Sequence, residues 1–245
     1  MARTAKTAKT AKSTALSPVT TSTDLAHPGG IPVHDSWANM PRETMARDYP
    51  RLMLCQNMSK CRQKNDPSYI EGIQEGDYYN NKTDQIYGRG PLTFSILADH
   101  GFRGVQYDDS RKIIDYHVSG NDPRMRKDAD GVVLAVPSVT WTVYLHQTKQ
   151  VLFFRNEKSA YYKTGPLYIK LQDKVGINRD QMLGICTVTS QNSPGVKGTY
   201  ERPVFQVTGL ADPDLLKLLQ QHRDYHQQAG IRPSDLDPPV SHATL

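Results

Sequence analysis

The stretch VTWTVYLHQTKQVLFFR, from Val139 to Arg155, decides how this chain folds. It places β-branched and aromatic residues on both sides of a short polar turn, which is the pattern of a β-hairpin. It also holds one of the chain's two tryptophans and two of its five phenylalanines. Directly opposed residues of an antiparallel pair share one face of the sheet, so the loop length determines which rings lie together.

An even-numbered loop opposes Trp141 to Phe154 and Tyr144 to Val151. One face then carries an almost wholly apolar set, namely Trp141, Val143, Leu145, Leu152 and Phe154. The other face carries Thr142, Tyr144, His146, Lys149, Val151, Phe153 and Arg155. A three-residue loop instead points the two cations into the apolar side, which buries unpaired charge. We therefore predict that Trp141 and Phe154 lie in the core, whereas Tyr144 and Phe153 lie on a surface.

From Pro50 onward the chain consists of short apolar runs separated by Gly, Pro, Asn and Asp, which is typical of an all-β domain. The predicted strands lie at 51–58, on both sides of a turn at 80–84, at 91–101, at 102–108 and at 132–136. A second hairpin is expected over 182–209, with Lys197 at the tip of its turn. Residues 110–118 fit a strand or a helical turn. Gly165-Pro166 is expected to prevent a continuous helix over 161–174.

One segment near the C-terminus has the pattern of a helix. Asp212 is a good N-cap, Pro213 stands at the first helical position, and Gly230 ends the run. Leu215, Leu218, Leu219 and His222 repeat at helical spacing between them. We predict a helix over 212–229 that packs on the sheet, inside one domain of residues 46–230.

The positive charge is concentrated at the N-terminus. The chain has 30 basic and 25 acidic residues, and four of the basic ones, Arg3, Lys6, Lys9 and Lys12, lie in the first twelve residues without an acid. We predict that residues 1–45 form a disordered basic tail and that 231–245 form a mobile tail. Mobile cations suit phosphate binding by counterion release, although a solubilising or added segment explains the same charge.

Several catalytic and metal-binding patterns fail on spacing. In NSPGVKGT the order Lys197-Gly198-Thr199 is not that of a phosphate-binding loop. His222 and His226 are four apart as in a zinc site, but Arg223 stands at the position of the metalloprotease glutamate. Cys55 and Cys61 lack zinc-knuckle spacing and are expected to be packing residues. We expect no enzyme, no cofactor and no metal.

The few, scattered cysteines and the lack of any apolar run of eighteen residues predict a cytoplasmic protein without a membrane span. Within it, a surface of aromatic rings edged by cations suits single-stranded nucleic acid, whose bases stack on rings while phosphates meet Lys or Arg. A helix or another subunit covering that face would give the same pattern. The candidate binding residues are Tyr144, His146, Lys149, Phe153, Arg155 and Lys197.

Three segments carry a resemblance: PRLMLCQNMS (50–59), EGIQEGDYYNNKTDQIYG (71–88), and GTYERPVFQVTGL (198–210) before the capped helix. Together they resemble phage- and plasmid-type single-stranded DNA-binding proteins with an oligonucleotide-binding (OB) barrel. The resemblance implies a mainly β, OB-like small barrel with a ligand groove on one face. The C-terminus departs from that design, because it has Asp235 and Asp237 but no acidic tip.

Two hypotheses follow. The first is a non-catalytic protein that binds single-stranded DNA or RNA, acting as an oligomer with partners in a phage or mobile-element replication, recombination or defence assembly. The second is a structural or adaptor component of a phage-like or defence assembly, in which the same face contacts protein.

Overall fold

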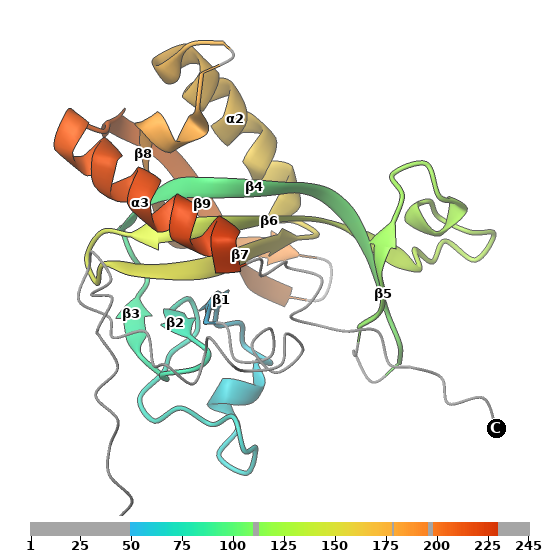
Figure 1. Cartoon of the computed structure of the whole chain (residues 1–245). Coiled ribbons are helices and arrows are strands. Elements are labelled where there is room, and N and C mark those ends of the chain that lie inside the picture. Colours follow the sequence, from blue (N-terminus) through green and yellow to red (C-terminus); the bar gives the residue numbers. More distant parts are fainter. Residues whose placement is uncertain (1–49, 110–112, 178, 196–197, 230–245) are drawn as a thin grey trace, which may run out of the picture.

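A single curled sheet dominates the protein (Figure 1). The computed structural model describes residues 50–109, 113–177, 179–195 and 198–229, so both predicted tails lie outside the described residues. The strands are β1 (Arg51–Leu54), β2 (Tyr78–Asn80), β3 (Ile86–Gly88), β4 (Leu92–Tyr107), β5 (Ile113–Val118), β6 (Ala135–Leu145), β7 (Gln150–Glu157), β8 (Gly184–Gly195) and β9 (Gly198–Leu210). The helices are α2 (Tyr161–Val175) and α3 (Pro213–Ala229), with short 3-10 turns η2 (Lys60–Arg62), η3 (Pro123–Met125) and η4 (Gln181–Leu183).

The sheet has nine strands in the order β3-β2-β1-β7-β6-β4-β8-β9, with β5 paired to β4. β1 runs parallel to β7, and each of the other pairs is antiparallel. The sheet curls into a half-barrel, which confirms the prediction of a mainly β, barrel-like domain with a packed C-terminal helix. No helix among the described residues has the length and apolar character needed to cross a membrane.

The β6–β7 hairpin has the predicted even register. Trp141 pairs with Phe154, Val143 with Leu152 and Tyr144 with Val151, around a loop of residues 146–149. The apolar face is buried as expected, and its rings pack edge to face, with 6.0 Å between the ring centroids of Trp141 and Phe154. Trp141 and Phe154 are therefore core residues, as the sequence predicts.

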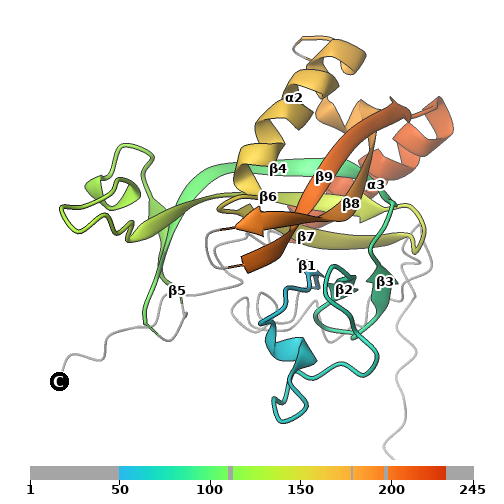
Figure 2. The same cartoon turned by 180° about the vertical axis from the view of Figure 1, so that it is seen from behind.

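Each face of this hairpin is covered by a different helix. On the Trp141 face, α2 completes the main core through Leu167, Leu171 and Val175, and the β8–β9 hairpin adds Val188 and Phe205 (Figure 2). On the opposite face, α3 packs Leu219 against Tyr144 and Val151 (Figure 1). The predicted C-terminal helix is confirmed, and its leucines lie against the sheet.

The structure corrects two predicted breaks. The runs 91–101 and 102–108 are not separate strands but the single long strand β4, which bulges at the predicted break and holds Gly101 at a φ of +74°. α2 is continuous through Pro166. Proline leaves the carbonyl four residues earlier without its helical donor, but here that residue is Tyr162, which is exposed to water. For residues 110–118, which fit a strand or a helical turn by sequence, the described part from Ile113 to Val118 is a strand, β5.

A flap of residues 113–134 extends from the far end of β4 and β6 (Figure 1). Arg124 holds it together, with its guanidinium nitrogens 2.9 Å from an Asp115 oxygen and 2.8 Å from an Asp122 oxygen. The hydrogen bonds that Asp122 accepts from the side chain and the backbone N–H of Arg124 lower the pKa of its carboxyl to about 2. The flap ends in three exposed apolar residues, Val132, Val133 and Leu134.

We expect Leu219→Ala to lower the free energy of unfolding by about 2–5 kcal/mol, because it leaves a cavity under α3. Lys217→Ala, on the exposed side of the same helix, is the control and should stay within about 0.5 kcal/mol of the parent. Denaturant unfolding of the two variants checks this. Equal stability of both would mean that α3 does not hold the sheet.

Candidate nucleic-acid interface

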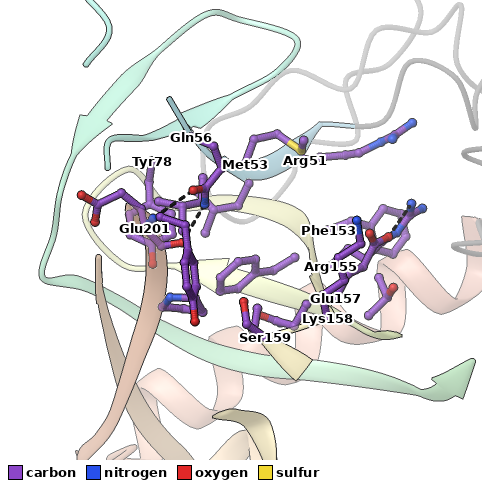
Figure 3. Close-up of a pocket in the computed structure, with 18 of the residues that line it drawn as sticks. Arg51, Met53, Gln56, Tyr78, Phe153, Arg155, Glu157, Lys158, Ser159 and Glu201 are labelled. Carbon is purple, nitrogen blue, oxygen red and sulfur yellow. Dashed lines mark hydrogen bonds and ion pairs between the residues drawn. The ribbon is translucent and has the colours of Figure 1, made fainter. Parts of the chain in front are cut away.

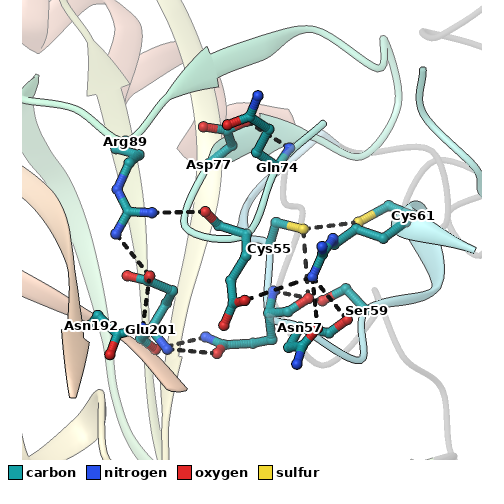
Figure 4. A network of polar contacts seen from close by, with 12 residues as sticks. Cys55, Asn57, Ser59, Cys61, Gln74, Asp77, Arg89, Asn192 and Glu201 are labelled. Atoms are coloured by element: carbon teal, nitrogen blue, oxygen red, sulfur yellow. Dashed lines mark hydrogen bonds and ion pairs between the residues drawn. The ribbon is translucent and has the colours of Figure 1, made fainter. Parts of the chain in front are cut away.

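The two ends of the half-barrel meet mainly through side chains. The Gln56 amide nitrogen, just after β1, donates to the Glu201 carbonyl oxygen at 2.7 Å, and its amide oxygen accepts from the Glu201 N–H at 2.9 Å (Figure 4). One side-chain amide thus forms the pair of hydrogen bonds that a neighbouring strand would offer to β9. Gln56 joins the β1 end of the sheet to its β9 end.

Arg89 makes the second connection across this junction. Its guanidinium lies 2.7 Å from Glu201 Oε1 and donates to the Glu75 carbonyl at 2.8 Å (Figure 4). The Arg89 carbonyl also accepts from the Ser190 N–H at 2.9 Å. We call these contacts of Gln56 and Arg89 with the β8–β9 hairpin the seam.

A pocket of about 440 Å³ opens beside the seam (Figure 3). The ladder between β1 and β7 ends at the pair Leu52 and Phe154, so Met53 and Leu54 diverge from the rest of β7. The pocket lies where they diverge, between β1, the end of β7, the segment 158–160 and the start of β9. Its volume falls within the range of small-molecule sites, roughly 300–1,000 Å³. We call it the seam pocket.

The lining of the seam pocket combines apolar, aromatic and cationic side chains. Phe153, Tyr107 and Tyr200 supply rings from three different strands. Figure 3 shows Gln56 and Glu201 on one side of the pocket and Phe153, Arg51 and Arg155 on the other. Lys158 is the exposed cation of the lining, with its ammonium 5.9 Å from the Tyr107 ring centroid.

The acidic side chains of the pocket already have partners. Glu157 accepts from the Tyr107 hydroxyl at 2.5 Å, and its other oxygen lies 3.4 Å from Arg155. Glu201 pairs with Arg89 across the seam. These partners reduce the repulsion that two free carboxylates would exert on an anionic ligand.

The predicted exposure of Tyr144 and Phe153 is wrong. Each is only 3% exposed, because Tyr144 lies under α3, 4.9 Å from the His222 ring, and Phe153 lies 5.5 Å from the His100 ring. Burial raises the pKa of the Tyr144 hydroxyl. His146, near the same end, contacts Ser95 Oγ at 3.1 Å, and burial lowers its pKa. At the Tyr144 end of this face, the alternative hypothesis holds, because the helix α3 covers it.

The predicted binding residues do not all lie at the seam pocket. Phe153 and Arg155 both line the seam pocket, where β7 brings them together. Lys149 is exposed in the hairpin loop, away from that lining. Lys197 and the cations of the tail, Arg3, Lys6, Lys9 and Lys12, lie outside the described residues. The six body residues therefore do not line one groove within the part of the chain that the structure describes.

Sequence reasoning missed Arg51, Tyr107, Lys158 and Tyr200. They belong to β1, β4, the β7–α2 connection and β9, and come together only when the sheet curls. A weak local signal existed for Tyr200, because it closely follows the turn whose tip carries Lys197. The others have no local signal that we recognise.

The histidine and cysteine patterns are explained by packing. His222 is buried against Tyr144, and the described residues contain no group of three His, Cys, Asp or Glu arranged to hold a metal. Cys55 and Cys61 are buried with their sulfurs 3.5 Å apart in a small apolar cluster, as predicted (Figure 4). Burial raises the pKa of the Cys55 thiol to about 12, so it stays protonated at neutral pH.

The N-terminal part of the chain matches a known family model. Residues 38–102, which include β1 to β3 and part of β4, match the family described as Pam3 phage gp34-like protein. This relates the chain to phage proteins. No curated protein and no solved structure matches the chain.

The seam should respond unequally to the loss of its two charges. The Glu201 side chain is 2% exposed and that of Arg89 is 49% exposed. We expect Arg89→Ala to cost about 3–5 kcal/mol, because it leaves a buried carboxylate without its cation. Glu201→Gln should cost less, since the remaining arginine is hydrated.

Urea unfolding of the two variants at neutral pH measures this difference. Equal losses, or a larger loss for Glu201→Gln, would contradict the assignment of the seam as a buried carboxylate held by an exposed cation.

Proposed function

We propose that this phage-related protein is a non-catalytic single-stranded nucleic-acid-binding protein and that the seam pocket takes one nucleobase. The observation that supports this most is the composition of the pocket, where rings and cations from distant strands converge on a volume of about 440 Å³. Base stacking and phosphate contacts are the two interactions that unspecific single-strand binding needs.

The rings supply the contact to the base. Stacking of one base on an aromatic side chain contributes about 1–3 kcal/mol and depends little on the base identity. Tyr107 and Tyr200 are half-buried pocket residues, so each leaves part of its side chain for a ligand. Phe153 is nearly buried and forms part of the apolar wall.

The cations supply contacts to the phosphates. Arg51, Arg155 and Lys158 line the pocket, and Lys158 is the most accessible of the three. In this proposal the base enters the pocket and the flanking phosphates lie against these side chains. The basic residues of the N-terminal tail act as an additional anchor that contacts phosphates without regard to sequence.

A structural or adaptor role in a phage-like assembly is the second candidate. The exposed run Val132–Leu134, where the flap joins β6, favours it, because three adjacent exposed apolar side chains suit a protein contact. In this role the seam pocket binds an extended segment of a protein partner beside β7, on the side where the ladder with β1 stops at Phe154.

Titration of labelled oligonucleotides decides between the two. We expect the full chain to bind a single strand more tightly than the matching duplex and to bind both more weakly at higher salt. Binding to neither, at either of two ionic strengths, would exclude the first candidate and leave the adaptor role.

Lys158→Ala tests the pocket within the same titration. It should weaken single-strand binding and reduce the slope of log K against log salt by about 0.7, the value for one phosphate contact to a single strand. Lys170→Ala on the exposed side of α2 is the matched control and should leave the slope unchanged. Equal effects of the two substitutions would place the nucleic acid elsewhere.

A further inference from the structure

The most unusual polar side chain of the seam pocket is that of Asn156. It lines the pocket and is 1% exposed. Among the described residues, neither its amide nitrogen nor its amide oxygen has a hydrogen-bond partner. A buried amide that lacks both partners is rare and lowers stability, so it requires an explanation.

Packing does not explain an asparagine at this position. Asn156 follows Leu152 and Phe154 on the apolar face of β7 and is paired with Val139 of β6. A leucine of similar size would suit these neighbours better. Because Asn156 lines the seam pocket, a ligand in that pocket can supply the missing hydrogen bonds.

We infer that the Asn156 carboxamide binds the pairing edge of one unpaired nucleobase, an inference that rests on the proposed function. The carboxamide oxygen accepts a hydrogen bond and the nitrogen donates one. The pairing edge of each nucleobase has a donor beside an acceptor, as in N3–H and O4 of thymine. In a duplex the opposite strand occupies that edge. Asn156 therefore selects unpaired bases over paired ones without distinguishing strongly among the four.

The test uses the wild-type protein and two single strands of equal length, one of thymidine and one of N3-methylthymidine. The methyl group removes the donor of the pairing edge but leaves the ring and the phosphates. We expect fluorescence anisotropy to give about tenfold weaker binding for the methylated strand, the ratio that corresponds to one buried hydrogen bond.

Asn156→Leu extends the test to the side chain. It should bind thymidine strands at least as weakly as the wild type binds the methylated strand, because it removes both hydrogen bonds of the carboxamide, and it should no longer distinguish the two strands. Its melting temperature should equal or exceed that of the parent, because the substitution removes an unpaired buried amide. If the variant does not fold, the wild-type comparison of the two strands still tests the inference.

The outcomes separate this inference from the proposed function. Equally tight binding of both strands by the wild type would overturn the role of Asn156 and leave the binding of single strands standing. Discrimination that persists in a folded Asn156→Leu variant would also overturn it. Binding of neither strand would overturn both.

Discussion

The side-chain closure of the half-barrel determines most of what is distinctive in this protein. Gln56 and Arg89 connect the β1–β3 end of the sheet to the β8–β9 end through Glu201. A ladder of backbone hydrogen bonds would bring the two ends together along their whole length. The few contacts of the seam hold the two ends of the sheet together without such a ladder. This allows β1 to diverge from β7 after Leu52. The seam pocket lies at that point of divergence.

The same arrangement divides the second face of the β6–β7 hairpin into two parts. At the loop end, α3 covers Tyr144 and Val151 and makes that end part of a core. At the other end, Phe153 and Arg155 both border the seam pocket. A single strand, β7, therefore contributes to the fold at one end and to the proposed binding site at the other.

The sequence predicts those features that depend on local pairing. The hairpin register follows from parity and from the cost of burying Lys149 and Arg155, and α3 follows from its cap and leucine spacing. The sequence fails where distant segments meet. Nothing near Tyr144 indicates that α3 returns to cover it, because this contact joins residues about 75 positions apart. The sequence predicts breaks at Gly101 and Pro166, but β4 accommodates Gly101 with a bulge and α2 continues through Pro166 next to an exposed turn at Tyr162.

The candidate site also combines residues that the sequence predicts with residues that only the fold brings together. Phe153 and Arg155 were identified as binding residues from their alternation with cations, and they do line the pocket. Their setting differs from the prediction, since Phe153 lies in the wall of the pocket and not on an open surface. Tyr107, Lys158 and Tyr200 join them only through the curl of the sheet, which no local pattern encodes.

The central claim is that a base of single-stranded nucleic acid enters the seam pocket. Photocrosslinking with a single strand that carries 5-iododeoxyuridine, followed by mass spectrometry of the peptides, tests it most directly, because this base reacts with aromatic side chains in contact with it. We expect crosslinks to aromatic residues that line the pocket, foremost Tyr107, Tyr200 or Phe153. Crosslinks confined to aromatic residues outside this lining, such as Tyr162 on the exposed side of α2, or no crosslink at saturating protein, would contradict the claim.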